Sequence, residues 1–282
     1  MKIDLHCHSS ASDGALAPAE LVARARERGI EVLALTDHDT LEGLPEARAA
    51  AREHGIRLIE GIELSCQWGG ATVHVLGYDF SDDAPALKAA IDDLHKGRWE
   101  RAEQIDKRLA AKGMPGMLDA ALAVQRELGD SGNAPARPHF AEALVRAGHV
   151  RDRAEAFRKW LGNGKLGDVR QHWPELEEAV ATLRAAGAWI SLAHPLQYDF
   201  TRSKRRRLVG EFIAAGGHAL EVVNGMQPAE QVGTLATLAR EFGLLVSAGS
   251  DFHAPGSWAE LGLYRPLPED LSPLWARFAQ AA

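Results

Sequence analysis

Seven short apolar runs, separated by helix-like segments, constrain the fold of this chain more than any other feature of its sequence. Each run has the length of a β-strand. The segment PAELVARARERG (18–29) illustrates the helical pattern, with Pro18 suited to a first turn and Gly29 to a helix end. This alternation predicts parallel strands joined by right-handed crossovers, in either a barrel or a doubly wound sheet. The predicted strands are 2–7, 31–36, 57–64, 71–78, 188–194, 218–223 and 244–251.

The stretch from 99 to 172 interrupts this alternation. It contains no strand-like run and is rich in Ala, Arg and Glu. We therefore predict an α/β barrel or sheet formed by 1–98 and 173–282, with a small helical insertion at 99–172 that acts as a lid and contributes to substrate specificity.

Charge and cysteine content exclude several classes of protein. The 32 Lys and Arg residues against 39 Asp and Glu give a net charge of −7, which argues against coating of nucleic acid or of an anionic membrane by bulk charge. Two cysteines cannot form a disulfide framework, and no 18-residue apolar run occurs. We expect a soluble, cytoplasmic protein with no membrane association and no obligate protein partner.

Potential metal ligands follow the predicted strands. His6 and His8 lie two residues apart, so that on a strand both would face the same side. A single polar residue at a strand end is as often structural as functional, but six strand ends carry one here. Functional groups of parallel α/β folds collect at these ends. The set is His6, His8, Asp13, His38, Glu63, His74, His194, Asp251 and His253.

Six imidazoles and three carboxylates without a thiolate suit Mn, Fe or Zn. Nine ligands are too many for one ion, so two or three divalent ions are predicted. We favour Mn²⁺, with Fe²⁺ and Zn²⁺ as alternatives. Cys7 lies between His6 and His8 and should face the opposite side, in the core.

The same residues resemble the polymerase and histidinol phosphatase (PHP) domain family of the amidohydrolase superfamily. The matching stretches are DLHCHSSASDG (4–14), TDHD (36–39), GIELS (61–65), HVLGYDF (74–80), LAHP (192–195) and GSDFH (249–253). This resemblance implies a distorted (β/α)7 barrel with two or three metal ions at its carboxyl end. Within the family, the ARPHF stretch (136–140) is similar to that of nucleoside 3′,5′-bisphosphate phosphatases and 5′→3′ exoribonucleases.

The resemblance also implies how the ligands are shared among the ions. Glu63 would bridge two of them, with the ligands of that pair completed by His6, His8, His74, His194 and Asp251. The remaining three ligands, Asp13, His38 and His253, would hold a third ion.

Three divalent ions against three carboxylates leave about three positive charges, which suits a phosphate ester better than a neutral amide. A metal ion lowers the pKa of bound water to roughly 7, so a metal-bound hydroxide could attack phosphorus at neutral pH. The leaving oxygen needs a proton or a metal, and three histidines are candidates for the proton donor. The predicted catalytic residues are His38, His194, His253 and Asp251.

Specificity requires a second anchor for the substrate. The candidates lie at the edges of the insertion, because the planar fork of arginine binds phosphate oxygens in pairs. For Arg98 and Arg101 a solvated helix face is an equal alternative, whereas Arg137 stands among Pro and Gly residues with no obvious helix face. The predicted substrate-binding residues are Asp13, Arg98, Arg101, Gln104, Arg137 and His139.

These features predict an enzyme that hydrolyses the 3′-phosphate of nucleoside 3′,5′-bisphosphates, for example adenosine 3′,5′-bisphosphate to AMP and phosphate. One alternative is a 5′→3′ exonuclease acting on short 5′-phosphorylated RNA or DNA, which the basic run RSKRRR (202–207) could guide. Others are a histidinol phosphate phosphatase and a non-catalytic, metal-stabilised domain. The complete ligand set disfavours the non-catalytic alternative.

Overall fold

The computed structural model describes residues 1–127, 134–162, 164–169, 173–256 and 259–278. The chain forms two compact units, one comprising Met1–Ala90 with Trp173–Ala282 and the other Ile91–His172. Within the described residues, no helix combines the length and apolar character needed to cross a membrane.

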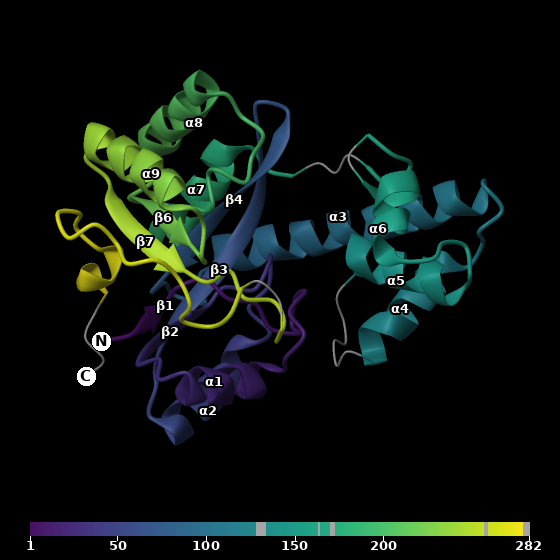
Figure 1. Ribbon diagram of the computed structural model, residues 1–282, viewed down its shortest axis with the longest axis horizontal. Coiled ribbons are helices and arrows are strands. Elements are labelled where there is room, and N and C mark those ends of the chain that lie inside the picture. The colour runs from purple at the N-terminus through teal and green to yellow at the C-terminus, as the bar shows by residue number, and fades with distance from the viewer. Residues whose placement is uncertain (128–133, 163, 170–172, 257–258, 279–282) are drawn as a thin grey trace. The chain divides into compact units, whose positions relative to one another are not determined.

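The first unit contains one seven-stranded sheet whose strands lie side by side in chain order (Figure 1). Backbone hydrogen bonds from Leu5 to Ala248 and from His8 to Phe252 join the chain around β1 to the chain around β7. The sheet is therefore a nearly closed barrel, which confirms the predicted fold class. The strands are β1 (Ile3–Asp4), β2 (Val32–Leu35), β3 (Arg57–Trp68), β4 (Ala71–Tyr78), β5 (Trp189–Leu192), β6 (Ala219–Asn224) and β7 (Leu245–Gly249).

One strand runs against the predicted direction. We expected every strand to be parallel and followed by a crossover helix, but β4 is antiparallel to both β3 and β5. The reason is a tight turn at Gly69 and Gly70, with φ angles of +56° and +80°, which reverses the chain directly after β3. Glycine adopts such left-handed angles at little cost, so the turn forms a hairpin.

Helices cover the outside of the barrel, and α1 (Pro18–Glu27) shows why the sequence forms them. Pro18 occupies its first turn, Leu21 and Val22 are fully buried, and Gly29 follows its end with a φ of +73°. The other α-helices that lie wholly within the first unit are α2 (Leu44–His54), α7 (Leu176–Ala185), α8 (Arg202–Ala215) and α9 (Ala229–Phe242). A short 3₁₀ helix follows at Leu274–Arg277.

All regular secondary structure among the described residues of the second unit is helical, and the unit has its own core, which includes Leu109, Phe140 and Leu144. Its first helix, α3, begins in the first unit, and the predicted start of the insertion at 99 lies inside it. The predicted end of the insertion at 172 lies outside the described residues. The helices are α3 (Pro85–Ala110), α4 (Met117–Glu127), α5 (Arg137–Arg146), α6 (Arg153–Ala156) and a π-helical turn at Phe157–Leu161.

Candidate metal centre

All nine predicted ligands meet at the carboxyl ends of β1, β2, β5 and β7 and on the hairpin of β3 and β4. Glu63 lies on β3 and His74 on β4, whereas the other seven follow strands β1, β2, β5 and β7. Their ligand atoms form four overlapping groups, each within 4.8 Å. The groups are His8, Asp13, His38 and His253; His6, His8 and Asp251; His6, Glu63 and His194; and His38, Glu63 and His74.

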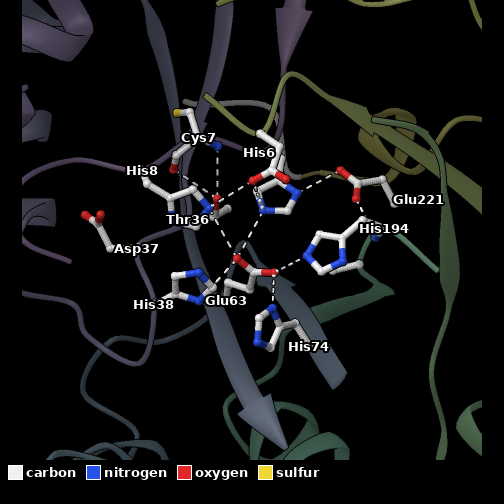
Figure 2. A network of polar contacts seen from close by, with 12 residues as sticks. His6, Cys7, His8, Thr36, Asp37, His38, Glu63, His74, His194 and Glu221 are labelled. Atoms are coloured by element: carbon white, nitrogen blue, oxygen red, sulfur yellow. Dashed lines mark hydrogen bonds and ion pairs between the residues drawn. The ribbon is translucent and has the colours of Figure 1, made fainter. Parts of the chain in front are cut away.

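The carboxylate of Glu63 lies at the centre of this cluster (Figure 2). Burial alone would raise the pKa of Glu63, but the surrounding imidazoles lower it well below its usual range. The carboxylate is thus held in its anionic, ligating form. Its Oε1 lies 3.0 Å from His74 Nδ1 and 2.9 Å from His194 Nε2, and its Oε2 lies 3.1 Å from His6 Nε2, 3.2 Å from His8 Nε2 and 3.3 Å from His38 Nδ1.

Two further carboxylates complete the cluster. Asp251 Oδ1 lies 3.4 Å from Nε2 of both His6 and His8. Asp13 Oδ1 lies 3.4 Å from His253 Nε2, and its Oδ2 lies 4.0 Å from His38 Nε2. The group around Asp13 contains the three residues predicted for the third ion, together with His8.

Several candidate ligand atoms are buried without a well-oriented hydrogen bond among the described residues, although some of them lie within 3.2–3.4 Å of a possible ion-pair partner: both ring nitrogens of His8, Asp13 Oδ1, His38 Nδ1 and His194 Nδ1. Buried polar atoms are normally paired, so this concentration of unpaired ones indicates a missing partner. A divalent cation is the partner that imidazoles and carboxylates together would hold. The donor set therefore fits two or three divalent ions.

The backbone is strained at two of the nine candidate ligands and at the residue that follows His38. Asp39, His194 and Asp251 have φ angles of +54°, +26° and +57°, in the region that favours glycine. Such conformations persist only where surrounding contacts fix them, and they concentrate at functional sites. Here the His194 N–H donates to Glu221 Oε2 over 2.7 Å, and the Asp251 N–H donates to the His6 carbonyl over 2.8 Å.

The two aspartates that flank His38 hold the backbone rather than join the ligand groups. Asp37 accepts hydrogen bonds from Ser9 N, Ser9 Oγ and Ser12 Oγ, each over 2.7 Å, and so fixes the turn that leads to Asp13. Asp39 accepts from Ser65 N over 2.6 Å and from Ser65 Oγ over 2.9 Å. The TDHD motif thus supplies one candidate ligand and two structural anchors.

Glu221 is a buried carboxylate of the site that was not predicted from the sequence. It lies on β6, is fully buried, and its two oxygens contact His6 Nδ1 at 2.8 Å and His194 N at 2.7 Å (Figure 2). The available signal was an acid in the middle of the apolar run HALEVV (218–223), because an isolated charge is costly to bury.

The predicted substrate-binding arginines lie in the second unit. Arg98 and Arg101 lie on α3, and Arg137 begins α5. Burial, with the charges of Arg137 and Arg98, lowers the pKa of Arg101 to about 10, so its guanidinium stays cationic at pH 7. Its Nε is buried without a hydrogen-bond partner among the described residues. The charges of Arg98 and Arg137 both act on Arg101, with Asp168 opposing them, so the three guanidinium groups are a candidate anion site.

The other two predicted substrate-binding residues of this unit differ from the arginines. Gln104 is exposed on α3. The Nδ1 of His139 accepts a hydrogen bond from Ala136 N over 3.1 Å, at the start of α5. This contact gives His139 a helix-capping role, and its contact with substrate stays a prediction.

Comparison with known proteins shows the family of this chain. The family model of the PHP domain matches residues 4–161. The chain belongs to the PHP domain family. It is 42% identical over 97% of its length to a 3′,5′-nucleoside bisphosphate phosphatase of Chromobacterium violaceum, covering 95% of that protein. It is 41% identical over 98% of its length to a 5′-3′ exoribonuclease of Haemophilus influenzae, covering 99% of that protein.

A solved structure gives the same result for the fold. The structure of an amidohydrolase from Chromobacterium violaceum superposes with a TM-score of 0.89 at 42% identity, covering 98% of this chain and 95% of that one. The predicted PHP membership is confirmed, and so is the prediction of an enzyme that hydrolyses phosphoester bonds with divalent metal ions.

Proposed function

We propose that the enzyme removes the 3′-phosphate from nucleoside 3′,5′-bisphosphates. The observation that carries this proposal is the pairing, in one chain, of a candidate metal centre with a separate cluster of arginines, Arg98, Arg101 and Arg137. Divalent metal ions suit the hydrolysis of one phosphate, and guanidinium groups suit the recognition of another. The relative from Chromobacterium violaceum, named for this activity, supports the same substrate class.

The candidate ligands would hold two or three ions, for which we propose Mn²⁺. When bound, these ions would neutralise the phosphate oxygens and make water nucleophilic near neutral pH. The protein's own residues would supply the proton for the leaving ribose oxygen, and the candidates are His38, His194 and His253, with Asp251 beside them. Of the nine ligands, His253 has the most exposed side chain, at 37%, and so exchanges protons with solvent most readily.

Phosphate release from matched substrates tests the proposal. Adenosine 3′,5′-bisphosphate and 3′-AMP differ only in the 5′-phosphate. Charge-assisted hydrogen bonds contribute about 1.5–3 kcal/mol, so kcat/KM for the bisphosphate should exceed that for 3′-AMP by about 10- to 100-fold. Equal rates for the two substrates, or for the bisphosphate and p-nitrophenyl phosphate, would contradict it.

Substitution of Arg137 refines this test. Arg137→Ala should lower kcat/KM for the bisphosphate towards the value for 3′-AMP. Arg146→Ala removes an arginine from the same helix, where it pairs with Glu127 and Glu142, and serves as the matched control. If both variants lower activity equally, the arginine cluster does not bind the second phosphate.

A second candidate substrate is a short 5′-phosphorylated oligonucleotide, supported by the 41% identity to a 5′-3′ exoribonuclease. Such an oligonucleotide presents the same 5′-phosphate, ribose and 3′-phosphoryl group as the bisphosphate. Turnover of adenosine 3′,5′-bisphosphate should therefore be compared with that of a 5′-phosphorylated trinucleotide at equal concentration. Exclusive turnover of the trinucleotide would replace the phosphatase proposal with the exonuclease one.

A further inference from the structure

A pocket of about 360 Å³ adjoins the candidate metal centre and shares His194 with it. Its volume lies in the range of small-molecule sites, about 300–1,000 Å³. The loops that follow β5 and β6 and the first turns of α9 form its wall, so it belongs entirely to the first unit. The described lining residues are His194, Leu196, Gln197, Asn224, Met226, Gln227, Pro228, Gln231 and Leu235.

The chemistry of this lining differs from that of the candidate metal centre and from that of the arginine cluster. Apart from His194, the described residues that line the pocket carry no charge. Four of them are amides, and Leu196, Met226 and Leu235 add apolar surface. A phosphate would find no counter-charge there, whereas an uncharged group with hydrogen-bonding edges would be matched.

Hydrogen bonds fix the amides nearest the metal centre. Asn224 Nδ2 donates to Glu221 Oε2 over 3.2 Å, and Asn224 Oδ1 accepts from Gln197 Nε2 over 3.1 Å. Gln197 Nε2 also lies 3.3 Å from Asp251 Oδ2. Because both contacts use Nε2, the Oε1 of Gln197 remains an acceptor for a ligand. The pocket thus continues directly from Glu221 and Asp251.

The rim of the pocket contributes a flat apolar contact and a further amide. Met226 is 45% exposed, although large apolar side chains are usually covered, and Gln231 is exposed beside it on α9. Methionine makes favourable contacts with aromatic rings. Asn and Gln side chains pair with the edge of adenine through one donor and one acceptor.

We propose that this pocket binds the nucleobase of the substrate, while the metal centre holds the phosphate that is cleaved. The inference rests on the proposed function, because only a nucleotide brings a base and a phosphate to adjoining sites. It assigns base recognition to Gln197, Met226 and Gln231. These three residues are not among the site residues predicted from the sequence.

The test compares adenosine 3′,5′-bisphosphate with a base-free analogue, the anhydro-ribitol carrying the same two phosphates. Loss of pocket contacts typically costs about tenfold or more in specificity, so the native enzyme should prefer the nucleotide by about tenfold in kcat/KM. The double variant Met226→Ala/Gln231→Ala should bring this ratio close to one. Leu263→Ala, which shortens another exposed apolar side chain outside the pocket, should leave the ratio unchanged.

Equilibrium binding of the products provides a readout independent of turnover. The manganese-loaded protein should bind AMP about tenfold more tightly than ribose 5-phosphate in calorimetry, and the double variant should bind the two equally. The inference would be overturned if the native enzyme showed equal kcat/KM and equal affinity for base-containing and base-free compounds. It would also be overturned if the double variant kept the native ratios of kcat/KM and affinity. Release of phosphate from neither bisphosphate would instead refute the proposed function.

Discussion

The side chains of Glu221 and His6 are joined by a hydrogen bond of 2.8 Å between Oε1 and Nδ1, and both are fully buried. A carboxylate can only accept, so Nδ1 carries the hydrogen, and in the neutral imidazole Nε2 keeps its lone pair. That nitrogen lies 3.1 Å from Glu63 and 3.4 Å from Asp251. Glu221 therefore orients His6 for metal binding, although no ligand group contains it.

We expect Glu221→Gln to weaken metal binding by about 10- to 100-fold, the usual effect of removing a partner behind a ligating histidine. Both oxygens of Glu221 accept from N–H groups, those of His6 and His194. The amide of glutamine must place its NH₂ group against one of them. Competition with a chelator measures the affinity, and circular dichroism checks that the variant is folded.

Glu260→Gln is the control for this variant. Glu260 also accepts hydrogen bonds, but from Arg24 on the outside of the barrel, where Oε1 lies 3.0 Å from Arg24 Nε. Its replacement should leave metal affinity unchanged. If Glu221→Gln binds metal as tightly as Glu260→Gln, Glu221 has no positioning role.

Metal uptake should release protons at pH 7. Burial lowers the pKa of His8, but Asp251 and Glu63 outweigh it and raise the pKa to about 10 in the metal-free protein. The His8 imidazole therefore holds its proton at neutral pH, and only the neutral imidazole binds metal. Affinity should increase with pH between about 6.5 and 10. Calorimetry of manganese binding in buffers of different ionisation enthalpy counts the protons.

Two outcomes decide this prediction. A dependence of the observed enthalpy on the buffer, with the sign of proton release, agrees with a protonated apo site. A binding enthalpy that is identical in all buffers, together with an affinity independent of pH, would show that His8 is already neutral before metal binds.

Seven of the nine candidate ligands could be predicted from the sequence because they are polar residues that follow apolar strands, whereas Glu63 and His74 lie within strands. His38 and His194, for example, each follow a strand, and the structure places both against Glu63. The supporting residues were less accessible. Asp37 and Asp39 have the same residue type as a ligand, and only their hydrogen bonds to Ser9 and Ser65 show that they hold backbone.

The contacts of the basic run RSKRRR (202–207) were also not predicted from the sequence. No aromatic residue lies within the run, yet Lys204 Nζ lies 4.2 Å from the ring centre of Phe200, and Arg207 lies 5.0 Å from that of Trp68. Arg205 donates to the carbonyls of Pro195 and Phe200, each over 2.9 Å. The contacts to Pro195 and Phe200 hold the loop after His194, whereas the contact between Arg207 and Trp68 depends on long-range packing that local sequence does not encode.

Asp37→Asn should destabilise the protein by about 1–3 kcal/mol, because the amide satisfies fewer of the buried donors of Ser9 and Ser12. The turn that leads to Asp13 should loosen with it. We therefore expect lower occupancy of the third ion, for which Asp13, His38 and His253 are the proposed ligands, measured as metal content after dialysis. Urea unfolding measures the stability.

Asp92→Asn removes an exposed acid on α3 and is the control. It should change neither the metal content nor the free energy of unfolding by more than about 0.5 kcal/mol. Full metal content in Asp37→Asn would show that the Ser9–Ser12 turn does not position Asp13.

Gly249→Ala should separate β7 from the segment that carries His6. A Cβ on Gly249 would lie 2.4 Å from His6 Cβ and 2.6 Å from His6 N, and the backbone nitrogen cannot move aside. We expect a loss of about 1–3 kcal/mol in unfolding free energy and weaker metal binding. Gly233→Ala is the matched control, because a Cβ there meets nothing within 4 Å on helix α9 and alanine should stabilise the helix by about 0.5–1 kcal/mol. Urea unfolding measures the change in the free energy of unfolding for both variants. Changes of opposite sign would show that the close approach of His6 excludes a side chain at Gly249, whereas equal changes would refute this.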